Sequence, residues 1–304
     1  MKLLITGSSG LLVLNLALEA MATHEVVGVD RAKLKSPPFP VVAADLLGPG
    51  EVDRVLDEAR PDAIIHCAAL ADLEACESDP ELARTLNAGL PRALAKASHA
   101  RGLQMVQIST DAVFDGTKSG SYVEEDAPHP ISVYAKTKLD GERGVLEEHP
   151  EAIVARVNFY GWSLSGRRSL AEFFFHNLTN NKSITGYTDV IFCPMHVSHL
   201  GGVLLAMLAK KMSGLYHAVG PEPMSKYRFG IEIARRFGLN DGEISPRSIH
   251  TSTLIAQRAN NLYLSTDKLS TALGTVLPSF STGLDLFYQQ AELGYPQKLR
   301  SYAQ

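Results

Sequence analysis

Cysteine is scarce in this sequence, and none of the cysteines is spaced for a shared role. The chain has three in 304 residues, Cys67, Cys76 and Cys193. A disulfide framework or a Cys-x-x-Cys metal site needs more cysteines at closer spacing. Because disulfides are rare inside cells, we expect three reduced thiols and no metal site.

Long apolar runs and basic clusters are also missing. No stretch approaches the roughly 20 apolar residues of a membrane-spanning helix. The opening MKLLITGSSG is a short apolar run that glycine interrupts, so it does not predict a secretory signal. The formal net charge is −4 and the Lys and Arg residues are dispersed, which disfavours a nucleic-acid surface. We therefore expect a cytoplasmic protein that binds neither nucleic acid nor membranes.

Short apolar runs alternate with helix-period segments over the first half of the chain. The apolar runs lack the alternation of half-exposed strands, and they span 2–6, 25–30, 63–69, 104–110 and 152–159. The helical segments between them span 11–21, 52–59, 80–101 and 133–148. This order predicts an α/β fold of the Rossmann type, with a doubly wound parallel sheet.

The pattern loosens after about residue 160. Further helices are expected at 169–180, 197–211 and 227–237, and further strands at 183–186, 190–193 and 214–220. From residue 240 onward the periodicity is fragmentary. We therefore expect a Rossmann-type domain of residues 1–160 and 189–219, and a smaller C-terminal lobe of residues 161–188 and 220–304 that closes over the sheet.

A glycine-containing turn follows the first apolar run. Gly7 would let the chain turn tightly, and Gly10 would let backbone N–H groups approach a pyrophosphate at the start of the next helix. The second run ends in Asp30, about 20 residues downstream, where a carboxylate can bind the adenosine ribose. The sequence therefore predicts a dinucleotide site.

The residues around that site bear on which dinucleotide binds. Asp30 favours the unphosphorylated ribose of NAD, whereas Arg31 can pair with the 2′-phosphate of NADP. Val13 stands where a third glycine often lets the helix pack closely on the strand. We expect NAD or NADP as cofactor, with NAD slightly favoured.

A candidate acid–base pair lies further along the chain. The run 104–110 ends in Thr110, and Tyr134 and Lys138 lie on the next helical segment. Positions i and i+4 share one face of a helix, and a nearby ammonium would lower the tyrosine pKa from about 10. We expect Tyr134 to give a proton to a carbonyl oxygen that Thr110 holds, while hydride reaches the carbon.

Several motifs together resemble the extended short-chain dehydrogenase/reductases, in their dTDP-4-dehydrorhamnose reductase-like branch. Tyr-x-x-x-Lys alone is weak in a chain with ten tyrosines, so the order of the motifs carries the likeness. The motifs are TGSSGLL at 6–12, DL at 45–46, HCAALADLEACESDPELARTLN at 66–87, ISTDAVFDG at 108–116 and YAKTK at 134–138.

The resemblance extends the set of expected cofactor residues. It implies that Lys138 also holds the nicotinamide ribose, and that Asn87 lies on the helix that backs the site. The full expected set is Gly7, Ser9, Gly10, Leu11, Leu12, Asp30, Arg31, Asp45, Leu46, Cys67, Ala68, Ala69, Ser109, Tyr134 and Lys138.

Departures from the family pattern concern the substrate. Sugar-nucleotide 4,6-dehydratases carry Thr-Asp-Glu, whereas here Ala112 follows Asp111, so dehydration is not expected. Rhamnose-forming reductases tend to have a tryptophan where this chain has Phe159. The candidate substrate residues are Asp111, Asn158, Phe159, Trp162 and Arg258.

The expected function is NAD(P)H-dependent reduction of a 4-keto group on a nucleotide-activated deoxysugar. Two alternatives stay open: a cofactor-binding regulatory subunit, like the one associated with methionine adenosyltransferase, and a nucleotide-sugar epimerase. The apolar run of Phe173, Phe174 and Phe175 belongs either to the core or to a subunit contact, so a homodimer is one possible assembly.

Overall fold

The central element is a parallel sheet of seven strands. The computed structural model describes residues 1–31, 34–251 and 256–303. The strand order is β11-β6-β5-β4-β1-β2-β3, and every neighbouring pair is parallel. The strands are β1 (Lys2–Thr6), β2 (Glu25–Asp30), β3 (Val41–Ala43), β4 (Ala63–His66), β5 (Gln104–Thr110), β6 (Ile153–Val157) and β11 (Gly214–Ala218).

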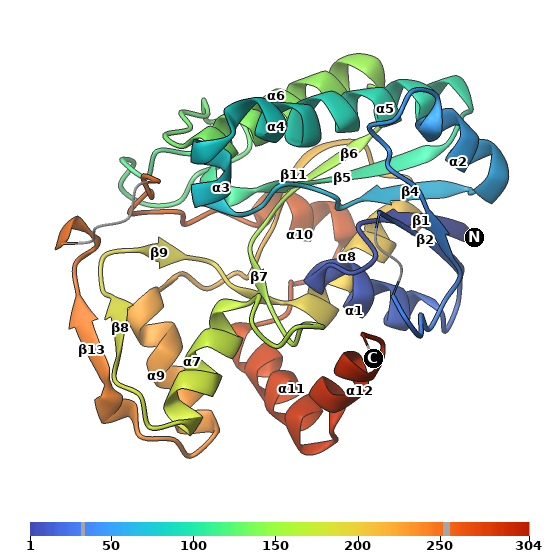
Figure 1. The fold of residues 1–304 in the computed structure, drawn as a ribbon. Helices are drawn as coiled ribbons and strands as arrows, with labels where there is room; N and C mark the ends of the chain where they lie inside the picture. Colours follow the sequence, from blue (N-terminus) through green and yellow to red (C-terminus); the bar gives the residue numbers. More distant parts are fainter. Residues whose placement is uncertain (32–33, 252–255, 304) are drawn as a thin grey trace.

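Helices cover both faces of this sheet (Figure 1). On one face, α1 (Leu11–Ala20) packs against α8 (Val197–Ala209). On the other face lie α2 (Glu51–Ala59), α5 (Leu90–Ala100) and α6 (Val133–Glu148). Alternate residues of the strands serve the two layers: Leu3 packs with the α1 and α8 side chains, and Leu4 with those of α2. The expected doubly wound Rossmann-type fold is confirmed.

The helix expected at 80–101 is interrupted. It consists of α4 (Pro80–Arg84), one turn of π-helix at Thr85–Gly89, and α5. The turn lies where α6 approaches most closely, because a Cβ atom on Gly141 would sit 2.2 Å from the carbonyl oxygen of Asn87. Local periodicity did not predict this break, because its cause is a contact with a helix about 50 residues further along the chain. Just before α4, α3 (Leu73–Ser78) follows β4.

The remaining elements form the lower part of the molecule in Figure 1. Its helices α7 (Leu170–Thr179), α9 (Lys226–Arg236) and α11 (Phe280–Glu292) pack on one another, and α12 (Tyr295–Ser301) packs on α11. Three two-stranded sheets pair β7 (Phe159–Tyr160) with β10 (Met195–His196), β9 (Ile191–Phe192) with β12 (Met224–Ser225), and β8 (Ile184–Tyr187) with β13 (Ile244–Arg247). The division of the chain into two domains stays a prediction.

The C-terminal segment is more helical than its sequence pattern indicated. It contains α10 (Asp267–Leu273), α11 and α12, besides short 3-10 turns at Asp241–Glu243 and Ile249–Thr251. The apolar spacing of Phe280, Leu284 and Phe287 places these side chains on one buried face of α11. Serine, threonine and glycine at the start of the helix obscured this spacing. Within the described residues, no helix combines the length and apolar character needed to span a bilayer.

Candidate active site

A cavity of about 420 Å³ opens at the carboxyl ends of β1, β2 and β4. Twelve expected cofactor residues line it: Gly7, Ser9, Gly10, Leu11, Leu12, Asp30, Arg31, Asp45, Leu46, Cys67, Ala68 and Ala69. Other lining residues were not expected from the sequence, among them Leu86, Leu90, Ile108 and Ser169. Leu86 and Ile108 lie inside the motifs at 66–87 and 108–116, whereas Leu90 and Ser169 come from segments with no motif of their own and are brought to the cavity by the fold.

The turn after β1 has the geometry that an anion cradle requires. Gly7 has a φ angle of +80°, and a Cβ atom there would lie 3.2 Å from the Cα atom of Ala68. The N–H of Gly10 donates to the carbonyl of Gly7 at 2.8 Å, which closes the turn. Among the described residues, no side chain caps the start of α1 and no acid lies in its first turn. The N-terminal amides of α1 therefore fit a pyrophosphate.

Asp30 ties the end of β2 to this turn. Its Oδ2 atom accepts a hydrogen bond from the N–H of Ser9 at 2.9 Å. The carboxylate thus lies between the phosphate cradle and Arg31, where an adenosine ribose would fit. Val13, in place of the third glycine, is buried and lines the same cavity.

The end of β5 holds a hydrogen-bonded carboxylate. Thr110 Oγ1 donates to Asp111 Oδ1 at 3.1 Å, and Asn158 Nδ2 donates to Asp111 Oδ2 at 2.6 Å. Asp111 is 4% exposed, and burial raises its pKa to about 6 although both donors act to lower it. Two expected substrate residues, Asp111 and Asn158, are therefore brought together with Thr110.

Lys138 lies on the sheet-facing side of α6, a helix that Ser132 caps by accepting from the N–H of Ala135. Its Nζ atom donates to the carbonyl of Ile108 at 2.6 Å. Burial lowers the pKa of Lys138 to about 8, and the charge of Glu142 opposes this shift. Ile108 lines the cavity, whereas Lys138 and Tyr134 are not among the described residues that line it.

The expected effect of Lys138 on Tyr134 is not found. Loss of hydration raises the pKa of Tyr134 to about 12, with a further contribution from the charge of Asp111; the Thr110 hydroxyl opposes both. The ammonium of Lys138 is instead turned toward the Ile108 carbonyl. At neutral pH the phenol of Tyr134 therefore carries its proton, as a proton donor must.

Ser109 was expected in the cofactor site, but its side chain is not among the described residues that line the cavity. Its side chain is buried and donates to Glu142 of α6. Successive residues of a strand point to opposite faces, so Ser109 turns to the α6 layer while Thr110 turns to Asp111.

Trp162 was expected near the substrate, and in the structure its side chain lies in the core. It is 1% exposed, its ring stacks on Phe287 with centroids 4.0 Å apart, and its Nε1–H donates to the carbonyl of Phe287 at 3.0 Å. The side chain is part of the core between α7 and α11. Phe159, in contrast, lines the cofactor cavity.

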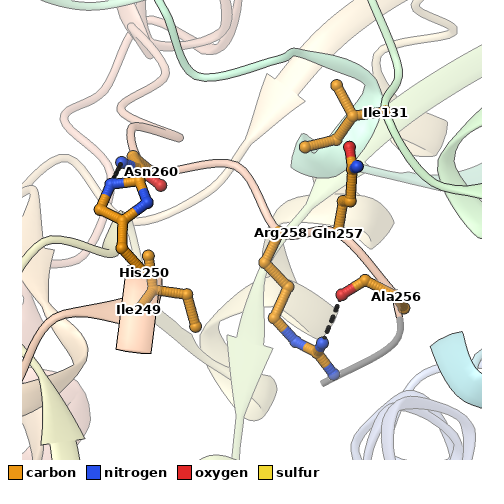
Figure 2. A pocket seen from close by; sticks show the side chains of 7 residues that line it. All are labelled: Ile131, Ile249, His250, Ala256, Gln257, Arg258 and Asn260. Atoms are coloured by element: carbon orange, nitrogen blue, oxygen red, sulfur yellow. Dashed lines mark hydrogen bonds between the residues drawn. The ribbon is translucent and has the colours of Figure 1, made fainter. Parts of the chain in front are cut away.

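A second cavity, of about 290 Å³, contains Arg258 (Figure 2). Figure 2 shows the guanidinium donating to the carbonyl of Ala256, at 2.7 Å. The same side chain pairs with Glu74 at 3.3 Å. The charges of Arg258 and Asp111 both act on the pKa of Lys226. This lysine therefore lies near both the second cavity and the end of β5. The other lining residues are Ile131, Ile249, His250, Gln257 and Asn260.

Asn87 forms hydrogen bonds to the segment after β4 and to α6. Its side chain accepts from the N–H of Leu70 at 2.9 Å, and donates to the carbonyl of Leu70 at 3.0 Å and to Thr137 Oγ1 at 3.1 Å. These bonds join the segment after β4 to α6, the helix that carries Tyr134 and Lys138. The π-helical turn at Thr85–Gly89 thus holds α6 against the end of β4.

Two proteins of known name are similar to this chain along most of its length. Methionine adenosyltransferase 2 subunit beta from Mus musculus is 36% identical over 295 residues, which cover 93% of this chain and 86% of that protein. A probable low-salt glycan biosynthesis reductase, Agl14, from Haloferax volcanii is 31% identical over 239 residues, covering 77% of this chain and 79% of that protein.

A solved structure covers almost the whole chain. The dTDP-4-dehydrorhamnose reductase from Bacillus anthracis, in complex with NADP, superposes with a TM-score of 0.86 at 26% identity, covering 95% of this chain and 99% of that one. Residues 1–293 match the family described as RmlD substrate binding domain. The chain therefore belongs to this family, which is the dTDP-4-dehydrorhamnose reductase-like family that its sequence resembles.

Proposed function

We propose that this chain is an NAD(P)H-dependent reductase of a 4-keto group on a nucleotide-activated deoxysugar. The observation that carries the proposal is that one fold places Tyr134 beside Thr110 and Asp111 at the end of β5, and a cavity with a dinucleotide phosphate cradle at the ends of β1, β2 and β4. The Bacillus anthracis relative, a dTDP-4-dehydrorhamnose reductase with NADP bound, supports both the reaction and the cofactor.

The cofactor would lie along the cavity of about 420 Å³ at the ends of β1, β2 and β4. The α1 amides would hold its pyrophosphate, Asp30 and Arg31 would meet the adenosine ribose, and the nicotinamide end would approach Ile108 and Phe159. A bound reduced nicotinamide would supply the hydride. We propose NAD as the preferred form, because a carboxylate at Asp30 disfavours a 2′-phosphate.

Side chains of the protein would supply the proton that the ketone oxygen receives. Tyr134 would donate its phenolic proton to the ketone oxygen as that oxygen gains negative charge, and would then recover a proton from solvent. Lys138, whose ammonium donates to the Ile108 carbonyl near the end of β5, would hold the nicotinamide ribose. Asp111 and Asn158 would orient the sugar hydroxyls through hydrogen bonds.

The nucleotide part of the substrate would extend toward the second cavity. Arg258 is a phosphate-binding side chain by its chemistry, and its present partners are Glu74 and a backbone carbonyl. The residues of the proposed C-terminal lobe, 161–188 and 220–304, would thus bind substrate, while 1–160 and 189–219 would bind cofactor.

A substrate screen tests this proposal. Nucleotide 4-keto sugars are mixed with NADH or NADPH, and cofactor oxidation is followed by absorbance. Tyr134→Phe keeps the ring and removes the proton donor, so turnover should fall by about 10²–10⁴-fold with the cofactor Kd little changed. Turnover of the variant at the original rate would show that Tyr134 is not the acid.

A regulatory role is the second candidate, favoured by the 36% identity to methionine adenosyltransferase 2 subunit beta. In that case the chain would bind a methionine adenosyltransferase catalytic subunit and turn over no nucleotide sugar. Size-exclusion chromatography of the chain with the catalytic subunit from its own organism, with and without NAD(P)H, tests it. A stable complex without reductase activity would replace the first proposal.

A further inference from the structure

A buried carboxylate lies two helical turns beyond Tyr134. Glu142 follows Lys138 by four residues and Tyr134 by eight, so all three share one side of α6. Glu142 is 3% exposed, and Lys138 beside it is 4% exposed. Nothing in the proposed reaction uses Glu142 directly, so its burial needs a separate account.

Two strands of the sheet hold this carboxylate in place. Ser109 of β5 donates to its Oε1 atom, and Arg156 of β6 donates through Nε at 3.0 Å and Nη2 at 2.8 Å. Arg156 is itself buried, and its guanidinium lies over the Phe114 ring, 4.9 Å from the centroid. Ser109 and Arg156 are register partners in the sheet, so both point to the α6 layer.

Burial of the Glu142–Arg156 ion pair costs free energy, because both charged groups lose their hydration. Removing two ions from water costs several kcal/mol for each ion in general, and well-packed apolar residues would often serve stability as well. The carboxylate has four hydrogen bonds that fix its position, but among the described residues the Nη1 atom of Arg156 has no partner. A fixed anion next to a buried lysine affects that lysine through its field.

The charged and titratable groups around Lys138 come from three elements. Glu142 lies on its own helix, while His66 and Cys67 lie at and just after the end of β4. Burial lowers the pKa of His66 to about 3, so it is neutral at pH 7, and burial raises the pKa of the Cys67 thiol to about 12. Arg156 of β6 faces Glu142. Among these groups, the charge of Glu142 is the one that most strongly opposes the effect of burial on Lys138.

We propose that Glu142 is a positioning residue for Lys138: anchored by Ser109 and Arg156 one helical turn beyond the lysine, its carboxylate favours the ammonium that donates to the Ile108 carbonyl. The role within a reaction rests on the proposed reductase function. The electrostatic relationship between Glu142 and Lys138 does not, so it can be tested without turnover.

The test is a direct NMR titration of the lysine side chains in isotopically labelled protein, with Lys138 assigned through Lys138→Arg. Glu142→Gln keeps the shape and removes the charge, so the pKa of Lys138 should fall from about 8 by about one unit or more. Glu148→Gln is the matched control, because Glu148 lies on the same helix and pairs with Arg92 at the surface. It should leave the titration of Lys138 unchanged.

A second variant covers the case in which Glu142→Gln does not fold with Arg156 left unpaired. Glu142→Gln/Arg156→Gln removes both charges, and the pKa of Lys138 should still fall, because the charge of Glu142 acts on Lys138. An unchanged or raised pKa in a folded Glu142→Gln or double variant would overturn the proposal. An equal fall in Glu148→Gln would overturn it as well.

Kinetics then separate this proposal from the reductase proposal. If the chain reduces a nucleotide sugar, the high-pH limb of its kcat/KM profile should move to lower pH in Glu142→Gln, in step with the NMR titration. A shifted lysine titration in a protein that turns over no nucleotide sugar would refute the reductase and leave the Glu142–Lys138 relationship standing.

Discussion

The side-chain amide of Asn158 donates to the carboxylate of Asp111 at 2.6 Å, which joins the ends of β5 and β6 at the candidate active site. The carboxylate is buried, and this raises its pKa to about 6 despite the hydrogen bond. A group held in this way is poised for chemistry at a cost in stability.

The first prediction concerns that cost. The pKa of Asp111 is raised on folding, from 3.8 to about 6, so the folded protein binds this proton more tightly than the unfolded chain. The resulting stabilisation is fully present below pH 4 and is lost as the pH rises through 6. Asp111→Asn should therefore gain in unfolding free energy relative to the unmodified protein between pH 4 and pH 8, by up to about 3 kcal/mol.

Urea denaturation of both proteins at several pH values measures this gain. Asp140→Asn serves as the control, because it makes the same change of charge at an exposed position on the helix that carries Tyr134. Parallel stability curves for Asp111→Asn and the unmodified protein would contradict the prediction.

The second prediction concerns cofactor choice. Asp30→Asn removes the charge near the ribose but keeps an oxygen that can accept from the N–H of Ser9. Coulomb repulsion between a carboxylate and a 2′-phosphate is worth about 1 kcal/mol or more at a partly exposed site. NADH should bind at least as tightly as NADPH to the unmodified protein, and the variant should narrow or reverse the difference. Fluorescence titration decides it, and a strong NADPH preference before substitution would show the reasoning to be wrong.

The sequence predicted best what depends on short segments. Gly7, Gly10 and Asp30 lie in the expected cavity because a strand, a turn and a helix fix them locally. The alternation of β5 predicts that the side chains of Ser109 and Thr110 lie on opposite faces of the sheet, so both were not to be expected in one site. The environment of Trp162 was beyond prediction, because α11, which covers it, showed only fragmentary periodicity. The pKa of Tyr134 depends on burial and on Asp111, which a motif does not report.

The third prediction separates core from site. Trp162→Ala should lower the free energy of unfolding by about 3–5 kcal/mol, because it empties a buried contact with Phe287 and removes an indole hydrogen bond. Phe159→Ala, at the partly exposed cavity wall, should cost less stability and weaken cofactor binding more. Thermal denaturation and cofactor titration of both variants test this. Full stability of the Trp162→Ala protein would contradict the prediction.

The last prediction concerns reaction type. Elimination of water from a sugar needs an acid for the leaving hydroxyl and a base for the adjacent proton, besides the hydride transfers. Asp111 is present at the end of β5, but the next position has only the methyl group of Ala112. The loss of one positioned acid–base group should cost about 10²–10⁴-fold in that step, whereas ketone reduction needs Tyr134 alone as donor. We therefore expect one NAD(P)H oxidised per product with a 4-keto nucleotide sugar, and no 4-keto-6-deoxy product from an unmodified nucleotide hexose. Mass spectrometry of the incubation with the unmodified nucleotide hexose distinguishes a reductase from a dehydratase. A product lighter by one water would assign the chain a dehydratase activity.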